Sequence, residues 1–310
     1  MTSKYNRAIV YDLETGGLSS TYNSITEIAM VAVDLESLEI IEETSILLKT
    51  RVDLKWCNTV SPIKDAKIIY NNLGTKDIET NIKTLMFKGQ KITLKNLEPL
   101  VEQIDAFYKV IEENDFDWIL DSNHIEELLK SEFCDIMEIF LSHCYNPQAL
   151  DVTGISMKLI DEEGLPHDEV YAKIKEMIAR HTVGNSKPII VGHNIGSLPR
   201  RIIKGKELGP DGFDNPFMEK LFNHYKDDWF ACVNEDIVDT LKWARMKWTE
   251  LPNFTLGTCA NEVGLTLKEA HRALPDTIAN AKFYIKMMQH LRGQGSEKTT
   301  YKRQKFNFQI

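Results

Sequence analysis

Apolar and β-branched residues gather in three short runs near the start of the chain. Residues 8–11, 25–33 and 40–48 are rich in Ile, Val and Ala, and the first run leads through a DLE triplet into the turn-forming sequence TGG. Side chains of this kind fit the half-buried surface of a sheet, whereas Gly and Thr mark the end of a strand. We therefore expect three neighbouring strands of an N-terminal sheet.

The pattern changes between residues 57 and 145. Apolar residues there recur every three or four positions in charged stretches such as NLEPLVEQIDAFYKVIEEN and NHIEELLKSEFCDIMEIFLSHC. This spacing is typical of amphipathic helices. We predict a helical insertion over 57–145, and its residues do not distinguish a cap on the sheet from a role in binding a substrate or a partner.

The second half of the chain alternates between helix and strand patterns. A helix is expected over 168–181 and a short buried strand over 188–191. Amphipathic spacing predicts further helices over 237–248, 255–263 and 275–291. The chain is therefore expected to be of mixed α/β class, ending in a flexible, basic tail over 293–310.

Composition narrows the class of protein. The 310 residues are 43% hydrophobic and 27% charged, which is ordinary for a globular chain. No run of eighteen apolar residues occurs, and the first twelve residues contain no long apolar segment, so we expect neither secretion nor a membrane span. The five cysteines are widely spaced and form no CxxC pair, which disfavours a zinc site or a disulfide framework and indicates a reducing, cytoplasmic compartment.

The net charge of −9 argues against a protein that coats duplex DNA. A protein that coats duplex DNA gains most of its affinity from Lys and Arg that neutralise phosphates. An enzyme that holds a few terminal nucleotides can have an acidic surface, because bound metal ions supply positive charge locally. A nuclease therefore remains compatible with the composition.

Asp12 and Glu14 are the first candidate metal ligands. They lie two positions apart on a predicted strand, so both carboxylates face the same side of the sheet. A divalent cation between them would relieve their repulsion, and hard oxygen ligands suit Mg²⁺ or Mn²⁺. The alternative is a solvated strand end followed by a turn.

The sequence His271-Arg272-Ala273-Leu274-Pro275-Asp276 supplies a second set of candidates just before a predicted helix. Pro275 suits the first helical position, and Asp276 would then lie in the first turn, where the helix dipole favours an anion. His271 would lie on the preceding loop. The alternative is a carboxylate that only stabilises the helix, beside a surface histidine.

Four motifs together resemble a known family. DLETGGL, GHNIG, VDTLKWAR and HRALPD, in that order, are similar to the DEDDh group of 3′-5′ exonucleases, which includes the proofreading subunits of bacterial replicative polymerases, RNase T and oligoribonuclease. The resemblance implies an RNase H-like exonuclease fold, in which helices flank a mixed central sheet. It assigns residues 1–56 and 146–292 to the exonuclease domain.

The chain departs from the family after GHNIG. The family continues within a few residues to a Phe-Asp pair, whereas Ser197 and Leu198 follow here. Phe213-Asp214 resumes the pattern, so we interpret 197–212 as an inserted loop and Asp214 as the third acid. Asp211 is the nearest rival, and a site that has lost this acid is the other alternative. The insert carries Arg200, Arg201, Lys204 and Lys206, which would hold substrate phosphates or simply be solvated.

The resemblance also implies roles for the remaining residues. Asp12, Glu14 and Asp276 would bind one Mg²⁺ or Mn²⁺, Asp12 and Asp214 would bind or support a second, and His271 would accept the proton of the attacking water. The substrate would be contacted by Thr15, Gly16, Gly17, Leu18, His193, Asn194, Phe213, Arg200 and Arg201. Asp239 and Arg245 are expected to have structural roles.

The expected function is removal of nucleoside monophosphates from the 3′ end of DNA, in proofreading or end trimming. A 3′-5′ exoribonuclease that trims short RNA or RNA 3′ ends shares the same residues and is one alternative. A catalytically impaired nucleic-acid-binding protein on the same fold is another. Candidate partners are single-stranded or 3′-terminal DNA, a polymerase, and a sliding clamp that would bind the tail around Gln304 and Phe308.

Overall fold

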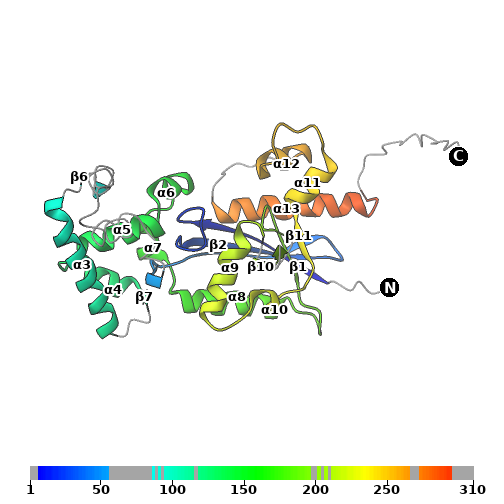
Figure 1. Cartoon of the computed structure of the whole chain (residues 1–310). Coiled ribbons are helices and arrows are strands. Elements are labelled where there is room, and N and C mark those ends of the chain that lie inside the picture. Colours follow the sequence, from blue (N-terminus) through cyan, green and yellow to red (C-terminus); the bar gives the residue numbers. More distant parts are fainter. Residues whose placement is uncertain are drawn as a thin grey trace.

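A mixed sheet forms the centre of the molecule in the computed structural model (Figure 1). The structure describes residues 6–55, 86–87, 90–91, 94–114, 118–196, 201–203, 206–208, 211–265 and 272–294. The sheet has five strands in the order β11-β8-β1-β2-β3. Its two halves are built differently: one is an antiparallel meander and the other is parallel.

The meander comprises the three strands predicted from the first apolar runs. β1 (Arg7–Thr15), β2 (Ile25–Asp34) and β3 (Glu39–Leu47) pair antiparallel, with Asp12 opposite Ala29 and Glu14 opposite Glu27. β8 (Ile189–Gly192) runs parallel to β1 and confirms the predicted buried strand. β11 (Ile237–Asp239) adds a parallel edge strand beside β8.

Helices cover both faces of the sheet (Figure 1). Even-numbered residues at the start of β1 pack against α13 (Ala273–Leu291), whereas odd-numbered residues pack against α8 (His167–Arg180) and α9 (Asp214–His224). The period of two in the strand therefore sends alternate side chains into two different cores. Asp12 and Glu14 belong to the even-numbered set and face the side of α13.

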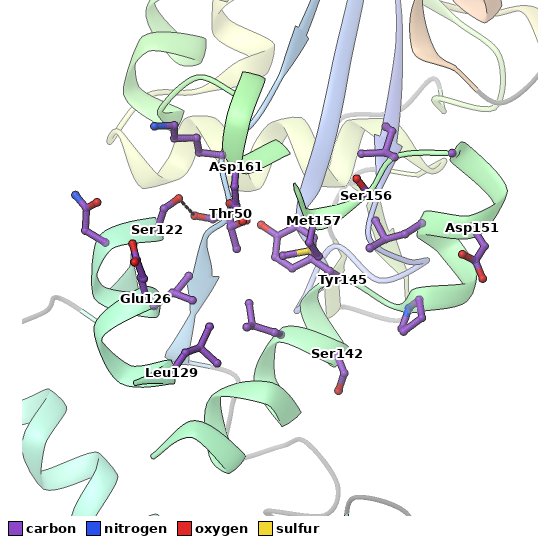
Figure 2. Close-up of a pocket in the computed structure, with 18 residues that line it drawn as sticks. Thr50, Ser122, Glu126, Leu129, Ser142, Tyr145, Asp151, Ser156, Met157 and Asp161 are labelled. Atoms are coloured by element: carbon purple, nitrogen blue, oxygen red, sulfur yellow. Dashed lines mark hydrogen bonds between the residues drawn. The ribbon is translucent and has the colours of Figure 1, made fainter. Parts of the chain in front are cut away.

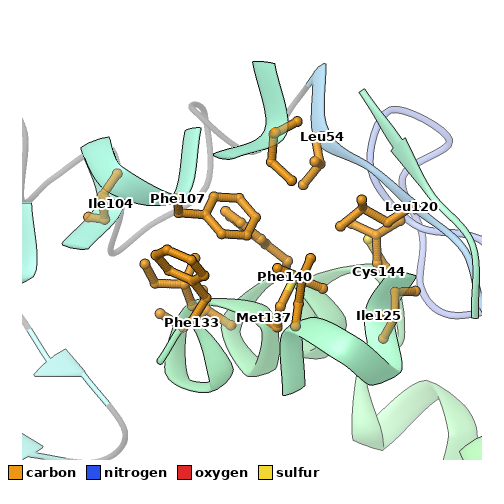
Figure 3. Close-up of a cluster of buried hydrophobic side chains, with 14 of the residues drawn as sticks. Leu54, Ile104, Phe107, Leu120, Ile125, Phe133, Met137, Phe140 and Cys144 are labelled. Atoms are coloured by element: carbon orange, nitrogen blue, oxygen red, sulfur yellow. The ribbon is translucent and has the colours of Figure 1, made fainter. Parts of the chain in front are cut away.

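A helical lobe lies beyond one end of the sheet (Figure 1) and consists of α3 (Leu94–Glu113), β7 (Ile119–Leu120), α4 (Ser122–Leu129) and α5 (Cys134–Cys144). Its core contains Phe107, whose ring centroid lies 5.6 Å from those of Phe133 and Phe140 (Figure 3). The two amphipathic stretches are thus helical, with the second divided into α4 and α5. The exact limits of the insertion, 57–145, stay a prediction.

One predicted helix begins too early. Residues 237–248 were expected to be helical throughout, but Ile237 to Asp239 form β11 and the helix α11 spans Thr240–Lys247. Two β-branched residues pair with β8, and Asp239 then caps the helix by accepting a hydrogen bond from the backbone N–H of Leu241 at 3.0 Å. A strand of three residues is too short to show its own period in the sequence.

The remaining elements agree with the mixed α/β class. The short helices are α6 (Pro147–Thr153), α7 (Met157–Glu163), α10 (Trp229–Cys232) and α12 (Leu256–Glu262), and the short strands outside the sheet are β4 (Val52–Asp53), β5 (Met86–Phe87) and β6 (Gln90–Lys91). Part of the predicted 197–212 loop is a hairpin of β9 (Arg201–Ile203) and β10 (Lys206–Leu208). In the described ranges, no helix is both long and apolar enough to span a bilayer.

Candidate active site

Three carboxylates meet beside the sheet, two from β1 and one from α13. Asp12 and Glu14 lie two residues apart on β1 and share one face, as their spacing predicted. Asp276 lies in the first turn of α13. Oxygen atoms of the three side chains all lie within 4.8 Å of one another, and all three residues are partly buried.

The electrostatics of this group are unfavourable without a counterion. Burial and the charges of Asp214, Glu14 and Asp276 hold the pKa of Asp12 well above its usual range. Burial and the charge of Asp276 raise the pKa of Glu14 to about 8. Because a divalent cation would relieve this repulsion, and because it prefers carboxylate oxygens, the donor set fits such an ion.

Asp214 begins α9 beside the same strand. It is buried, with 2% exposed, and the backbone N–H of Leu13 donates a hydrogen bond to its carboxyl. Burial nevertheless raises the pKa of Asp214 to about 7. Within the described part of the chain, Asp214 Oδ1 has no hydrogen-bond partner. Asp214 therefore adjoins the segment that carries Asp12 and Glu14, although it lies outside the group of three within 4.8 Å.

Asn215 fixes the start of α9 and so the position of Asp214. Its Oδ1 accepts hydrogen bonds from the hydroxyl of Tyr11 at 2.7 Å and from Nε1 of Trp229 at 3.0 Å. Its Nδ2 donates to the carbonyl of Ile195 at 2.8 Å. Because these contacts are buried and satisfy the side-chain amide, they hold the helix start against β1.

The two ends of the 197–212 insertion meet. The backbone N–H of Phe213 donates to the carbonyl of Asn194 at 2.8 Å, bridging the insert. Gly196 and Gly212 have φ values of 88° and 86°, and a Cβ on Gly212 would lie 2.1 Å from the carbonyl carbon of Ile195. This close approach is expected if a hairpin interrupts a continuous motif, and it supports the interpretation without fixing the domain boundaries.

Asp211, the rival of Asp214, has a different environment. Its Oδ2 lies 2.9 Å from Nζ of Lys242, which neutralises the carboxylate. The side chains of 197–210 lie outside the described residues. The expected phosphate contacts of Arg200 and Arg201, and the environment of Leu198, therefore stay predictions.

Asp239 connects the turn of the GHNIG motif to α11. Its Oδ1 accepts from the backbone N–H of Asn194 at 3.0 Å, and its Oδ2 accepts from that of Gly196 at 3.1 Å. It also caps α11, as described above. This buried carboxylate therefore holds a turn in which Asn194 has a φ of 70°, which agrees with the structural role expected for it.

His193 is also bound within the protein. Its Nδ1 lies 3.1 Å from Oγ1 of Thr240, and its Nε2 lies 2.8 Å from the carbonyl of Phe254. Both ring nitrogens thus have protein partners, so a contact of His193 with substrate would use its ring surface. Arg245 lies over the ring of Phe254, with Cζ 5.9 Å from its centroid, consistent with a structural role.

The glycine loop after β1 packs against the helical lobe. Oγ1 of Thr15 donates to the carbonyl of Gly17 at 2.7 Å. A Cβ on Gly16 would lie 2.0 Å from the carbonyl oxygen of Cys144, so only glycine fits there. Leu18 is 88% exposed. The loop therefore presents an apolar side chain to solvent from a tightly packed base.

Glu27 is not among the site residues predicted from the sequence. It lies on β2, opposite Glu14. Its carboxylate accepts hydrogen bonds from Nε of Arg272 at 3.1 Å, from Oγ of Ser45 at 2.6 Å and from the backbone N–H of Ala273 at 3.2 Å. These bonds attach the start of α13 to the sheet. A single glutamate within an apolar strand was the available clue.

The start of α13 differs from the prediction in one detail. The helix begins at Ala273, two residues before Pro275, so Pro275 is inside the first turn and not at its first position. Proline is tolerated there because the first backbone N–H groups of a helix have no partner within it. His271, the predicted general base, lies outside the described residues.

A separate cavity of about 950 Å³ lies among the helical elements (Figure 2). Residues of α4, α5, α6 and α7 line it, together with Thr50 and Tyr145. None of the four acids of the candidate site lines it. The cavity therefore does not contribute to the carboxylate site.

Comparison with known proteins gives relatives in sequence and in fold. The chain is 27% identical over 167 residues to a PolC-type DNA polymerase III from Bacillus cereus, covering 53% of this chain and 10% of that protein. A PolC-type polymerase from Oceanobacillus iheyensis is 27% identical over 163 residues, with coverage of 52% and 10%. No model of a protein family matches the sequence.

Among solved structures, the fold resembles E. coli exonuclease I in complex with a dT13 oligonucleotide, with a TM-score of 0.50 and 15% identity over 93% of this chain and 42% of that one. A product-bound exonuclease I gives a TM-score of 0.50 at 13% identity, covering 93% and 45%. The chain thus has a fold like that of exonuclease I, which confirms the predicted α/β, RNase H-like fold class, and both sets of relatives agree with the predicted resemblance to 3′-5′ exonucleases. It spans less than half the length of the proteins it matches.

Proposed function

We propose that this chain is a metal-dependent 3′-5′ exonuclease that hydrolyses terminal phosphodiester bonds of single-stranded DNA. The observation that carries the proposal is the convergence of Asp12, Glu14 and Asp276, from opposite ends of the sequence, within 4.8 Å. The relationship to PolC-type polymerases and to exonuclease I in complex with dT13 supports DNA as the substrate.

The acids have distinct roles in this proposal. Asp12, Glu14 and Asp276 would hold one divalent cation, and Asp12 with Asp214 would bind or support a second. Bound Mg²⁺ or Mn²⁺ supplies a lowered pKa for the attacking water and neutralises charge on the leaving oxygen. When it is ionised, the buried Asp214 adds negative charge beside Asp12, which strengthens cation binding at the shared ligand.

The residues around the acids would bind and orient the substrate. Leu18 offers an apolar surface for the last base, and the backbone of the glycine loop lies beside it. His271 would accept the proton of the attacking water from its position just before α13. Arg200 and Arg201 would hold phosphates upstream.

A degradation assay tests this proposal. A 5′-labelled single strand, a duplex with a recessed 3′ end and an RNA of the same sequence are incubated with Mg²⁺ or Mn²⁺, with EDTA as control. We expect a ladder of progressively shorter labelled DNA that EDTA suppresses, with nucleoside monophosphates as the product. Faster shortening of the RNA would favour the exoribonuclease, and intact substrates that remain bound would favour the impaired binding protein.

A further inference from the structure

The glycine loop, residues 16–24, is attached to the helical lobe through one buried side chain. Asn23 is 5% exposed, and its Nδ2 donates hydrogen bonds to the carbonyl of His143, in the last turn of α5, and to the carbonyl of Gly16 at 3.4 Å. Its Oδ1 accepts from the backbone N–H of Ser19 at 2.8 Å. Every polar atom of this side chain therefore has a backbone partner.

Two backbone hydrogen bonds strengthen the same connection. The N–H of Ser24 donates to the carbonyl of Cys144 at 3.1 Å, and the N–H of Asn146 donates to the carbonyl of Gly16 at 2.7 Å. The last carbonyls of a helix have no partner within the helix. Here the loop supplies donors for two of these carbonyls: Nδ2 of Asn23 for that of His143 and the N–H of Ser24 for that of Cys144. The loop therefore caps α5 from a distant part of the sequence.

These contacts fix both sides of Leu18. Gly16 and Gly17 precede it, and a Cβ on Gly17 would lie 2.6 Å from Oδ1 of Asn23. Ser19 follows it and is bound to the same Oδ1. Leu18 itself is 88% exposed, so its orientation depends on how firmly its neighbours are held.

We propose that Asn23 is a positioning residue through which the helical lobe fixes the glycine loop and holds Leu18 against the base of the 3′-terminal nucleotide. The inference rests on the proposed exonuclease function. It gives the helical lobe a role in substrate binding, because α5 supplies the surface against which the loop is built. The chemical class of ligand is the terminal base of a single DNA strand, bound through its apolar face.

The substitution Asn23→Asp tests the connection selectively. It keeps the size of the side chain and an acceptor for Ser19, but replaces the donor to the carbonyl of His143 with an oxygen. Asn114→Asp is the matched control, because Nδ2 of Asn114 donates to the carbonyl of Val110 at 2.8 Å near the end of α3, also in the helical lobe. Both variants lose one donor to a helix carbonyl, but only the first loses contact with the loop.

A double-mutant cycle with Leu18→Ala distinguishes positioning from general stability. We expect Asn23→Asp to raise the KM for a single-stranded oligonucleotide about tenfold while kcat changes by less than about threefold. Leu18→Ala should raise KM similarly, and the double variant should be no worse than Leu18→Ala alone. Asn114→Asp should leave both constants within about twofold of the wild type.

Equal effects of Asn23→Asp and Asn114→Asp, or fully additive effects of Asn23→Asp and Leu18→Ala, would overturn the inference. The same double-mutant cycle can be evaluated from binding alone, by measuring the dissociation constant of a fluorescent oligonucleotide in Ca²⁺ in place of Mg²⁺ or Mn²⁺. A wild-type protein that binds but does not cleave would refute the exonuclease and leave this cycle measurable. A wild type that neither binds nor cleaves would remove both proposals.

Discussion

Arg272 Nε lies 3.1 Å from Oε2 of Glu27, and Arg272 Nη2 lies 3.2 Å from Oε1 of the same carboxylate. This two-bond contact joins the residue just before α13 to the third residue of β2. Glu27 also lies opposite Glu14, which is on β1 with Asp12. The ion pair therefore connects the neighbour of the strand that carries two candidate ligands to the helix that carries Asp276. Arg272 is therefore placed to set the position of Asp276 relative to β1.

The first prediction is that loss of this ion pair impairs catalysis more than stability. Arg272→Lys cannot make both hydrogen bonds of the guanidinium, and Glu27→Gln removes the charge. We expect either change to lower kcat/KM on single-stranded DNA by about 10- to 100-fold, as is typical for groups that orient metal ligands. Steady-state kinetics measured for each variant over a range of Mn²⁺ concentrations gives the size of the effect. It also separates weaker metal binding from slower turnover.

Glu42→Gln is the matched control for this experiment. Glu42 is also a strand carboxylate that binds a helix arginine, with Oε1 2.6 Å from Nη2 of Arg180, but it lies on β3 and contacts α8. Its loss should change kcat/KM by less than about twofold, because exposed ion pairs contribute little. Similar losses in both variants would contradict a specific role for the Glu27–Arg272 pair.

A second prediction concerns the opposing effects of Asp12 on stability and activity. Asp12→Asn removes a carboxylate whose pKa is raised by burial and by neighbouring charges, so the metal-free variant should unfold about 2–4 °C above the metal-free wild type. The same variant should lose activity by at least about 100-fold, because it lacks a metal ligand. Thermal unfolding in EDTA and the degradation assay measure the two effects.

Asp34→Asn is a suitable comparison, since Asp34 ends β2 and pairs with Arg7 at the surface of the same sheet. It should lower the unfolding temperature slightly and leave activity unchanged. A metal-free Asp12→Asn protein that is less stable than the wild type would argue against repulsion among the acids.

The sequence was sufficient for the acids on β1 but not for the contacts that position them. The period of two placed Asp12 and Glu14 on one face, and the structure agrees, because a strand's own geometry determines this. Glu27 and Arg272 are 245 residues apart, and Asn23 and His143 are 120 apart. Such pairs meet only after the sheet and helices have packed, so no local pattern indicates them.

Local pattern also misjudged short elements. The segment before α11 was assigned to the helix because its apolar spacing continues without a break, although Val238 pairs with Val191 in the sheet. The parallel partner, and not the segment's own residues, makes it a strand. By contrast, the longer β2 and α8 were predicted to within one residue at each end, because a long periodic segment is less ambiguous.

The third prediction separates Asp214 from Asp211. Asp214 adjoins Leu13 between the two strand acids, whereas Asp211 pairs with Lys242. Asp214→Asn should lower kcat by at least about 100-fold and weaken Mn²⁺ binding in calorimetry, whereas Asp211→Asn should alter neither by more than about twofold. Leu198→Asp should also change little; a large gain from it would mean that the third acid belongs directly after GHNIG.

The last prediction is that the metal-free protein becomes less stable as the pH rises above 7. Native Glu14 and Asp214 have pKa values raised to about 8 and about 7, so they retain protons that the unfolded chain has already released near its ordinary pKa of about 4. The native state then binds more protons than the unfolded state, and its stability falls as the pH passes through these values.

A buried histidine dictates the range in which this effect is measured. Burial lowers the pKa of His167 to about 3, whereas the ordinary pKa of a histidine in the unfolded chain is about 6.5. The contribution of His167 to the free energy of unfolding therefore rises with pH and is complete near 6.5. Between pH 7 and 8.5 the carboxyl effect should therefore dominate in EDTA, and Glu14→Gln should reduce the slope. Saturating Mg²⁺ should raise the unfolding temperature more at pH 8.5 than at pH 7, because the cation competes with protons for the same oxygens. A metal-free unfolding temperature that stays level or rises over this interval would mean that the acids are already compensated by other groups.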